Sequence, residues 1–299
     1  MELTWLMKLR IAAAAVIGVV LVGIISWPSQ SSLDPFGSLV FKQIGTNSSI
    51  TLLIMAFLAG LISYFAAWPY GREIGILAVP FGLSIWAMRA GTTGALMQLN
   101  SALSQRQIIL ETLKWESLFW LLVLTCGFAG VLFAQRIELR LKNRKQEEQK
   151  NIVTPAKFGN VILSLILSAV IAAFCLNIFA RDVAIQDNSL SYVLAQPAIG
   201  QIIFAVLLSF GIASFIVKLF LNVGYIWPTI SCYFVSYYAI SRYMNNVTLE
   251  HFVEHYPAIF FPNAIVSILP VQIVTFAAIG SVAGYWMAVR SNYWRKHEM

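Results

Sequence analysis

Eight long apolar segments recur along the chain, and each is separated from the next by polar or turn-forming residues. A helix needs about 20 mostly apolar residues to cross ~30 Å of hydrocarbon, where the backbone must satisfy its own hydrogen bonds. The segments span residues 11–27, 50–68, 74–91, 117–135, 159–179, 199–219, 224–243 and 265–289. The pattern therefore predicts an all-α fold, a polytopic membrane helix bundle with about eight transmembrane helices.

The break between the sixth and seventh segments is the weakest of the seven. The break signals in this nearly continuous apolar stretch are Lys218, Asn222, Gly224 and Pro228. A single span of about 45 residues would be far longer than a bilayer requires. We therefore expect a tight turn between two helices at residues 219–224.

The composition strengthens the membrane interpretation. Of the 299 residues, 59% are hydrophobic and 11% are charged, whereas roughly 25% are charged in a typical soluble domain. The mean hydropathy is +0.76. These values exclude a disordered chain and argue against a soluble one, so the lipid bilayer is the first expected partner. Cys126, Cys175 and Cys232 lie in apolar segments and are interpreted as small buried hydrophobes.

The formal net charge of +7 is unevenly distributed along the chain. Lys8 and Arg10 precede the first segment, basic residues crowd residues 136–150, and Arg290 and Lys296 lie at or beyond the end of the last segment. Under the positive-inside rule this distribution predicts that both termini are cytoplasmic and that the protein is integral to a cell or inner membrane. The charge is thus assigned to the membrane surface, and no nucleic acid partner is expected. The first segment is interpreted as a retained helix rather than a signal peptide.

The order of helices and loops in the first half of the chain recurs in the second half. We therefore divide the chain into a first four-helix membrane unit (1–135), a charged cytoplasmic linker (136–158) and a second four-helix membrane unit (159–299). At a fixed offset without gaps, several residues coincide, among them Arg89 with Arg242. The coincidences are compatible with two tandem units related by duplication. The alternative is that long outer and short inner loops alternate without any duplication.

Arg89 and Arg242 each end the third apolar segment of their half, on the side expected to be outer. Charged residues inside a bilayer are costly and are commonly functional, whereas long side chains near span ends can reach the interface. The two arginines would contact an anionic head group or substrate. Alternatively, they anchor the helices at the interface and pair with acidic residues such as Asp34 or Asp187.

Polar residues inside the apolar segments are the candidates for lining a cavity. Tyr233 and Tyr237 lie four residues apart on one helix face, and their hydroxyl groups need partners. The full set of cavity-lining candidates is Tyr233, Tyr237, Asn177 and Gln272. Pro80 and Pro228 lie inside two segments, where proline removes a backbone hydrogen bond, and are candidate hinges. Ordinary packing between helices is the alternative for all of them.

Residues 251–255, with the sequence HFVEH, match the HxxEH pattern of inverted zinc metalloproteases. On a helix, His251 and His255 share a face and would bind the metal, with Glu254 as the general base. A third ligand would have to come from elsewhere in the chain, and a short surface helix is the alternative. The sequence contains no nucleotide-binding or nucleophile-elbow motif, so no cofactor is expected from motifs.

The sequence leaves three functional hypotheses open. The preferred one is a non-catalytic subunit or scaffold of a larger membrane complex, with other membrane subunits as partners, because no ionisable residue lies at the centre of a segment. The second is a permease for an uncharged, amphipathic or lipid-like substrate, which the repeated units and the prolines favour. The third is a metal-dependent membrane hydrolase at the outer face. An enzyme is the less favoured class.

Overall fold

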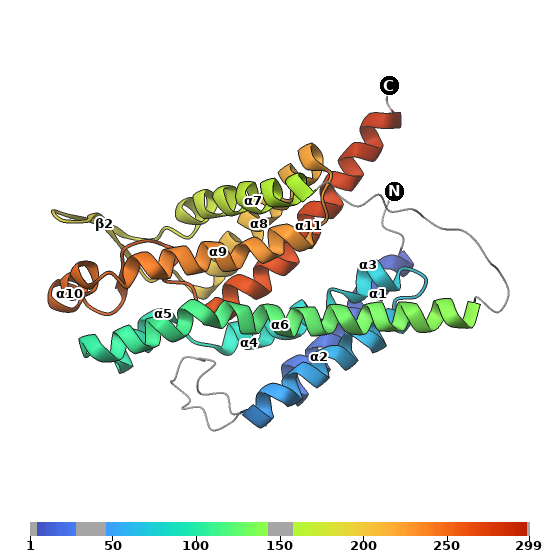
Figure 1. The fold of residues 1–299 in the computed structure, drawn as a ribbon, viewed down its shortest axis with the longest axis horizontal. Coiled ribbons are helices and arrows are strands. Elements are labelled where there is room, and N and C mark those ends of the chain that lie inside the picture. Colours follow the sequence, from blue (N-terminus) through green and yellow to red (C-terminus); the bar gives the residue numbers. More distant parts are fainter. Residues whose placement is uncertain (1–4, 28–45, 143–157, 298–299) are drawn as a thin grey trace. The chain divides into compact units, whose positions relative to one another are not determined.

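Helices make up most of the fold in the computed structural model of this chain (Figure 1), which describes residues 5–27, 46–142 and 158–297. Six helices in these residues are long and apolar enough to cross a membrane, or seven if one bent helix pair counts as a single span. The expected all-α, membrane-type architecture is thereby confirmed, but the count of eight spans is not. We conclude that the chain is an integral membrane protein.

The seventh expected segment, 224–243, is helical but less apolar than the membrane spans. It forms α9 (Ile226–Tyr243), whose serines, tyrosines and Arg242 lower its mean hydropathy. The turn expected before it is present, because α8 (Ile199–Leu221) ends at Asn222 in the left-handed conformation with a φ of 52°. Asparagine tolerates this conformation better than most residues do.

The third and fourth expected segments differ from the prediction in opposite ways. The third, 74–91, is interrupted: α3 (Gly71–Gly75) is followed by α4 (Ala78–Arg89), and a bend of 46° separates this pair from α5 (Thr93–Leu99). The fourth is extended at both ends into α6 (Leu103–Lys142), a helix of 40 residues. Most of the expected charged linker lies outside the described residues.

The described residues form two compact units. The first contains residues 5–27, 46–86 and 121–142, and the second contains residues 87–120 and 159–297. The chain passes between the units inside α4 and inside α6. In this division residues 87–120 belong with the second unit and residues 136–142 with the first, and the expected domain boundaries stay a prediction. The tandem duplication stays a prediction.

Helices of the first unit approach one another closely at glycines. This unit contains α1 (Trp5–Gly18), the π-helix η1 (Val19–Ile25), α2 (Thr46–Ala66), α3 and parts of α4 and α6. A methyl group at Gly60 would lie only 2.0 Å from the carbonyl oxygen of Gly127. Small residues allow membrane helices to pack at such short distances, so the absence of a side chain here lets α2 contact α6.

The second unit uses the same kind of packing between α8 and α11 (Pro270–His297). A methyl group at Gly284 would lie 2.0 Å from the carbonyl oxygen of Gly211. Next to this contact, the Ser214 hydroxyl donates a hydrogen bond of 2.7 Å to the Ser281 carbonyl. Close backbone approach and a buried hydrogen bond together hold the two helices.

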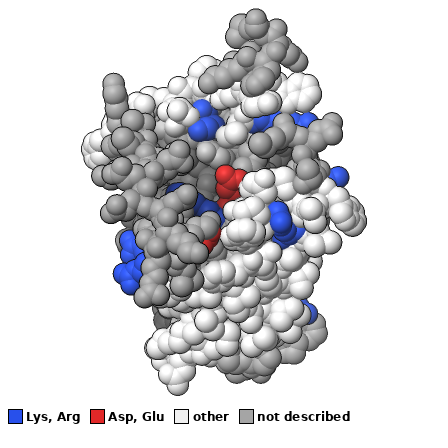
Figure 2. All heavy atoms as spheres, turned by 90° about the vertical axis from the view of Figure 1, so that its right-hand side faces the viewer, with Lys and Arg blue, Asp and Glu red and all other residues white. Residues whose placement is uncertain are grey.

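Charged side chains are unevenly distributed on the described surface. On the face shown in Figure 2, the coloured side chains are mainly Lys and Arg, with little Asp or Glu. Two basic residues of the second unit, Lys218 and Arg290, lie near Tyr225, the residue that precedes α9. Lys218 is close to the end of α8, and Arg290 is in α11. The Lys218 ammonium lies 4.8 Å from the ring centroid of Tyr285.

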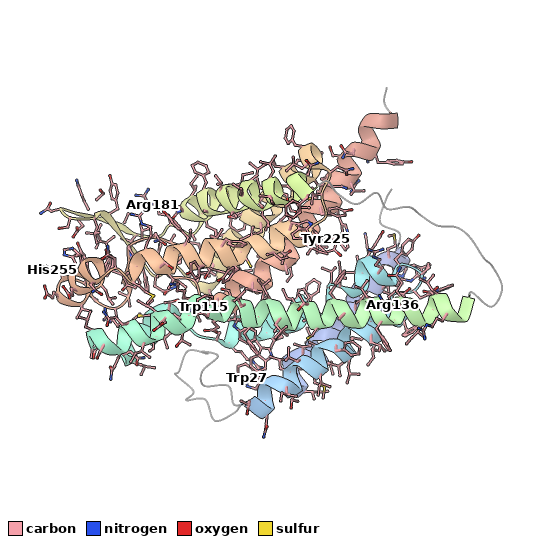
Figure 3. All side chains as sticks on the ribbon, viewed as in Figure 1. Trp27, Trp115, Arg136, Arg181, Tyr225 and His255 are labelled. Carbon is pink, nitrogen blue, oxygen red and sulfur yellow. The ribbon has the colours of Figure 1, made fainter. Side chains whose placement is uncertain are left out.

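One end of the second unit carries a small antiparallel sheet that the sequence did not predict. The sheet has the strand order β1-β2-β3, with β1 (Ala184–Asp187), β2 (Ser191–Ala195) and β3 (Phe260–Phe261). The neighbouring helices are α7 (Phe158–Phe179) and α10 (Asn246–His255). We call this end, formed by the three strands and α10, the hairpin end. Figure 3 labels Arg181 and His255 near it and Tyr225 at the opposite end of the same unit.

Gln196 connects three chain segments at the hairpin end. Its Oε1 accepts a hydrogen bond of 3.0 Å from the Gly94 backbone N–H, and its Nε2 donates one of 2.9 Å to the Ser267 carbonyl. Gly94 lies in α5, and Ser267 precedes α11. This side chain therefore helps to explain why residues 87–120 belong with the second unit.

Candidate functional site

A groove of about 560 Å³ lies within the second unit and is lined mainly by α7 and α9. Ligand pockets commonly occupy roughly 300–1,000 Å³, so the volume suits one small molecule or one lipid chain. We call this feature the α7–α9 groove. It is lined by α7 from Ala169 to Asn177, by α9 from Phe234 to Tyr243, and by side chains of the hairpin end.

The walls of the α7–α9 groove away from the hairpin end are mostly apolar, and its rims are exposed. Small side chains at Ala169, Ala173 and Ala239 leave the space between the helices. Val170 and Phe234 border it and are 62% and 49% exposed. Apolar side chains exposed to this extent on a membrane helix are stable against lipid, so the groove is open to the surface that lipid would cover.

The groove becomes polar where it reaches the hairpin end. There it is lined by Arg242, Asn177, Thr248 and Asn263. No acidic side chain occurs among the lining residues that the structure describes. The groove therefore changes along its length from an apolar channel to a positively charged, hydrogen-bonding end.

Two amide side chains at the polar end each use one polar atom in hydrogen bonds to the backbone. Asn263 Oδ1 accepts hydrogen bonds from the backbone N–H groups of Ile265 at 3.1 Å and Val266 at 3.0 Å. Asn177 Nδ2 donates one of 2.9 Å to the Ala173 carbonyl. The remaining capacity is therefore a donor on Asn263 and an acceptor on Asn177.

Arg242 has no carboxylate partner among residues 5–27, 46–142 and 158–297, and its side chain is exposed. One expected alternative partner, Asp187, bonds to His251 and Tyr256 instead. The other, Asp34, lies outside the described residues. Among the described residues, no carboxylate takes up the guanidinium donors at the polar end of the groove.

Three of the other candidate residues lie away from the groove. Arg89 ends α4 with an exposed side chain and is not part of the lining. The rings of Tyr233 and Tyr237 are tilted by 47° with their centroids 5.5 Å apart, and the Tyr237 ring contacts Trp115 and lies 4.5 Å from the Lys114 ammonium. The two tyrosines therefore take part in aromatic and cation–π packing against α6.

Gln272 was expected to line a cavity. In the structure its side chain is buried, with 1% exposure, and hydrogen-bonds to backbone groups of separate segments. Its Oε1 accepts a hydrogen bond of 3.1 Å from the Leu269 N–H, and its Nε2 donates to the carbonyls of Ala87 at 3.1 Å and Gly91 at 3.2 Å. The amide thus satisfies backbone groups where α4 ends and where α11 begins. Its donors and its acceptor are taken up by the fold.

The two candidate hinge prolines lie in first helical turns. Pro80 is the third residue of α4, and Pro228 is the third residue of α9. Backbone N–H groups in a first turn have no partner within the helix, so proline removes no helical hydrogen bond there. Pro80 lies just after the interruption between α3 and α4, and Pro228 lies just after the turn that precedes α9, so the hinge role of both stays a prediction.

Asp187 ties the strand hairpin to α10 and the loop that follows it. Its Oδ2 accepts hydrogen bonds from the Tyr256 hydroxyl at 2.5 Å and His251 Nε2 at 3.0 Å, and its Oδ1 accepts from the backbone of Ser189 and Leu190, both at 2.7 Å. The Tyr256 hydrogen bond, helped by the other three, holds the pKa of the Asp187 carboxyl well below its usual value despite partial desolvation. The same bond raises the pKa of Tyr256.

The Asp187 network adjoins the polar end of the groove. Leu190, whose backbone N–H bonds to Asp187, lines the groove, and so does Thr248, one helical turn before His251 on α10. The network therefore fixes two elements that border the polar end. From the sequence, Asp187 was expected as an alternative partner for Arg89 or Arg242.

The proposed metal-binding residues His251, Glu254 and His255 all lie on α10. The two imidazoles stack at 4.6 Å, with His251 Nε2 bonded to Asp187 and His255 Nδ1 lying 3.2 Å from the His251 carbonyl oxygen. In the part of the chain that the structure describes, no group of three or more His, Cys, Asp or Glu side chains is placed to hold a metal ion. The metal hypothesis stays a prediction without support from geometry.

Sequence reasoning anticipated two groove residues, Arg242 and Asn177, and missed the rest. Thr248 and Asn263 belong to a short helix and a loop, and the pair Pro262-Asn263 signals only a turn. Comparison with known proteins found no matching family model, no matching curated protein and no matching solved structure.

Proposed function

We propose that this integral membrane protein binds one lipid-like, amphipathic molecule in the α7–α9 groove and acts as a component of its transport. The proposal rests on one observation: Arg242, without a carboxylate partner among the described residues, lies with other polar side chains at one end of a groove that is mostly apolar elsewhere. Burying a chain against apolar walls is favourable at roughly 25 cal/mol per Å². A polar head would be held at Arg242, because charged hydrogen bonds are stronger than neutral ones.

The orientation in the membrane is part of the proposal. Both termini are cytoplasmic, and the hairpin end lies at the outer face of a cell or inner membrane. The basic residues Lys218 and Arg290, near the opposite end of the second unit, support this orientation through the positive-inside rule. The head of the bound molecule would then lie in the outer leaflet.

A scaffold within a membrane complex remains the second candidate function. It is favoured by a row of exposed apolar side chains on α7, four residues apart: Ile162, Ile166, Val170, Phe174 and Ile178. Such a row would contact a partner helix, but lipid would cover it equally well. The groove, which combines space with a directed charge, favours a lipid-like ligand over a partner helix.

Blocking the groove tests the proposal. Ala173→Trp would fill the space between α7 and α9, whereas Ile166→Trp would add the same ring to the exposed row of α7 outside the groove lining. Native mass spectrometry of both variants and the wild type, purified in the same mild detergent, measures the lipid that each retains. We expect the wild type and Ile166→Trp to keep one bound lipid and Ala173→Trp to lose it.

Melting temperatures of the three proteins identify a variant that has lost its fold. Equal lipid retention in folded Ala173→Trp and Ile166→Trp would remove the groove as the binding site. A folded wild type that retains no lipid in any mild detergent would contradict the proposal as well.

A further inference from the structure

The head group that fits the polar end is defined by the charge and the hydrogen-bonding capacity of its lining. We infer that the α7–α9 groove selects an anionic phosphodiester lipid whose head group ends in an uncharged polyol, as in phosphatidylglycerol. The inference rests on the proposed function, because it names the ligand class of the same groove. It follows from three features of the lining.

The first feature is a pair of donors for an anion. The Arg242 guanidinium presents up to five N–H donors, in a planar arrangement that matches phosphate oxygens. The Asn263 amide adds donors at Nδ2, because two backbone N–H groups at 3.1 and 3.0 Å already occupy its Oδ1. Both side chains line the same end of the groove, so a phosphodiester there meets charge and directed hydrogen bonds together.

The second feature is the lack of a counter-charge for a cationic head group. Among the lining residues that the structure describes, none is acidic. The nearby carboxylate of Asp187 is occupied by Tyr256, His251 and two backbone N–H groups. A choline or ethanolamine ammonium would therefore gain no ion pair at this end and would be repelled by Arg242.

The third feature is hydrogen-bonding capacity for hydroxyl groups. Asn177 Oδ1 is left as an acceptor, because its Nδ2 donates to the Ala173 carbonyl. The Thr248 hydroxyl can both donate and accept. Acceptors beside an arginine suit the hydroxyls of a glycerol-like head group, whose donors would otherwise lose their bonds to water on entering the groove.

The apolar walls favour an anion that is attached to a lipid chain over a free anion. A free phosphate would contact Arg242 and Asn263 but would leave the wall of Val170, Phe234 and Ile265 uncovered. A chain attached to the phosphate covers that wall and adds affinity in proportion to the apolar area that it buries. The preferred ligand therefore has its phosphate near Arg242 and its chain along α7 and α9.

Lipid titrations followed by native mass spectrometry test the inference. The probes are dioleoyl phosphatidylglycerol, dioleoyl phosphatidylcholine and dioleoyl phosphatidic acid, which share their chains and differ in their heads, together with inorganic phosphate as a competitor. The wild type should bind phosphatidylglycerol about tenfold more tightly than phosphatidylcholine, as expected for one charge-assisted contact. Inorganic phosphate at an equal concentration should not displace the lipid.

Three variants separate the contributions of the lining. Arg242→Gln should abolish the preference for phosphatidylglycerol over phosphatidylcholine. It removes only an attraction from phosphatidylglycerol, whereas phosphatidylcholine loses the attraction of its phosphate and the repulsion of its ammonium together. Asn177→Leu should reduce only the preference for phosphatidylglycerol over phosphatidic acid, which lacks the polyol. Arg89→Gln, at the end of α4 and outside the groove lining, is the matched control and should behave like the wild type.

Each contrary result has a distinct meaning. Equal wild-type affinities for phosphatidylglycerol and phosphatidylcholine would overturn the head-group inference but leave the proposed function standing, provided that Ala173→Trp blocks both lipids. Arg242→Gln lowering both affinities equally would also overturn it. Displacement by inorganic phosphate alone would contradict a lipid as the source of the anion. Binding that Ala173→Trp does not affect would remove the proposed function together with the inference.

Discussion

Asp187 and His251 are 64 residues apart in the sequence, yet His251 Nε2 donates a hydrogen bond of 3.0 Å to Asp187 Oδ2. The bond joins the end of β1 to the middle of α10. The Asp187 side chain is 8% exposed, so water competes little for its oxygens. Leu190, in the turn after β1, and Thr248, in α10, both line the α7–α9 groove, so this contact helps to shape the polar end of the proposed lipid site.

Asp187→Asn should loosen the hairpin. The amide retains the size of the side chain but loses the charge that accepts four hydrogen bonds. We expect hydrogen exchange of residues 184–195 to become about tenfold faster, because charge-assisted hydrogen bonds hold the local structure closed. The control is Asp182→Asn, a change at an exposed residue just before β1. Unchanged exchange in Asp187→Asn would show that the network does not hold the hairpin.

The same network should give hairpin docking a dependence on pH at both extremes. The pKa of Asp187 is lowered in the folded protein, so its contribution is complete above the usual value of 3.8 and is lost as the pH falls towards the lower folded value. The pKa of Tyr256 is raised, so its contribution is complete below the usual 10.0 and is lost as the pH rises through the higher folded value.

Hydrogen exchange of residues 184–195, corrected for the intrinsic rate, measures this dependence. Protection in the wild type should decline as the pH falls below about 4. Asp187→Asn should lack this acid-dependent decline, and Tyr256→Phe should lack the decline at alkaline pH. An acid-dependent decline of equal size in Asp187→Asn would assign the effect to another group.

Gly284→Ala should destabilise the pairing of α8 with α11. The added methyl group would lie 2.0 Å from the Gly211 carbonyl oxygen, and a backbone atom cannot move aside without shifting a helix. Overpacking of this kind costs about 1–3 kcal/mol. We expect a lower melting temperature in detergent, measured by intrinsic tryptophan fluorescence.

Gly200→Ala is the matched control for that change, because no atom lies within 4 Å of the added methyl group. Alanine is favoured over glycine in a helix by roughly 0.5–1 kcal/mol, so this variant should melt no lower than the wild type. Equal melting temperatures for the two variants would show that α8 and α11 do not approach as closely as the structure indicates.

Gln272→Leu should destabilise the second unit without altering lipid preference. The change removes the partners of the Leu269 N–H and of the Ala87 and Gly91 carbonyls. Leaving a buried backbone group unsatisfied costs about 1–3 kcal/mol. Gln98→Leu, at an exposed position of α5, is the control and should melt like the wild type. A change in lipid selectivity without a change in melting temperature would show that Gln272 contacts the ligand and would contradict its structural role.

The long helices could be predicted from the sequence, because continuous apolar runs have few alternatives in a bilayer. The turn at Asn222 was predicted correctly from weak break signals. The number of spans was not, because α9 combines a helical pattern with serines and tyrosines, and because the bend between α4 and α5 depends on packing rather than on composition. The strands of the hairpin are too short for their alternation to be distinctive.

Only part of the candidate site could be predicted from the sequence. Arg242 and Asn177 are conspicuous because polar residues are rare in apolar segments. The groove itself depends on the small volumes of Ala169 and Ala173 and on Asn263, which reaches the site only through the fold. Gln272 looked equally conspicuous, but its donors and its acceptor are used by backbone groups, which no sequence pattern reveals.

Photo-crosslinking from the groove tests the central claim most directly. The photoreactive amino acid p-benzoylphenylalanine would replace Val170, which borders the groove, or Ile162, which is exposed on α7 outside its lining. After irradiation in native membranes, mass spectrometry identifies the adducts. We expect a lipid with an anionic phosphodiester head to be enriched at position 170, and bulk lipids at position 162. The same bulk lipids at both positions, or a protein adduct at position 170, would contradict the assignment of the α7–α9 groove as a lipid-binding site.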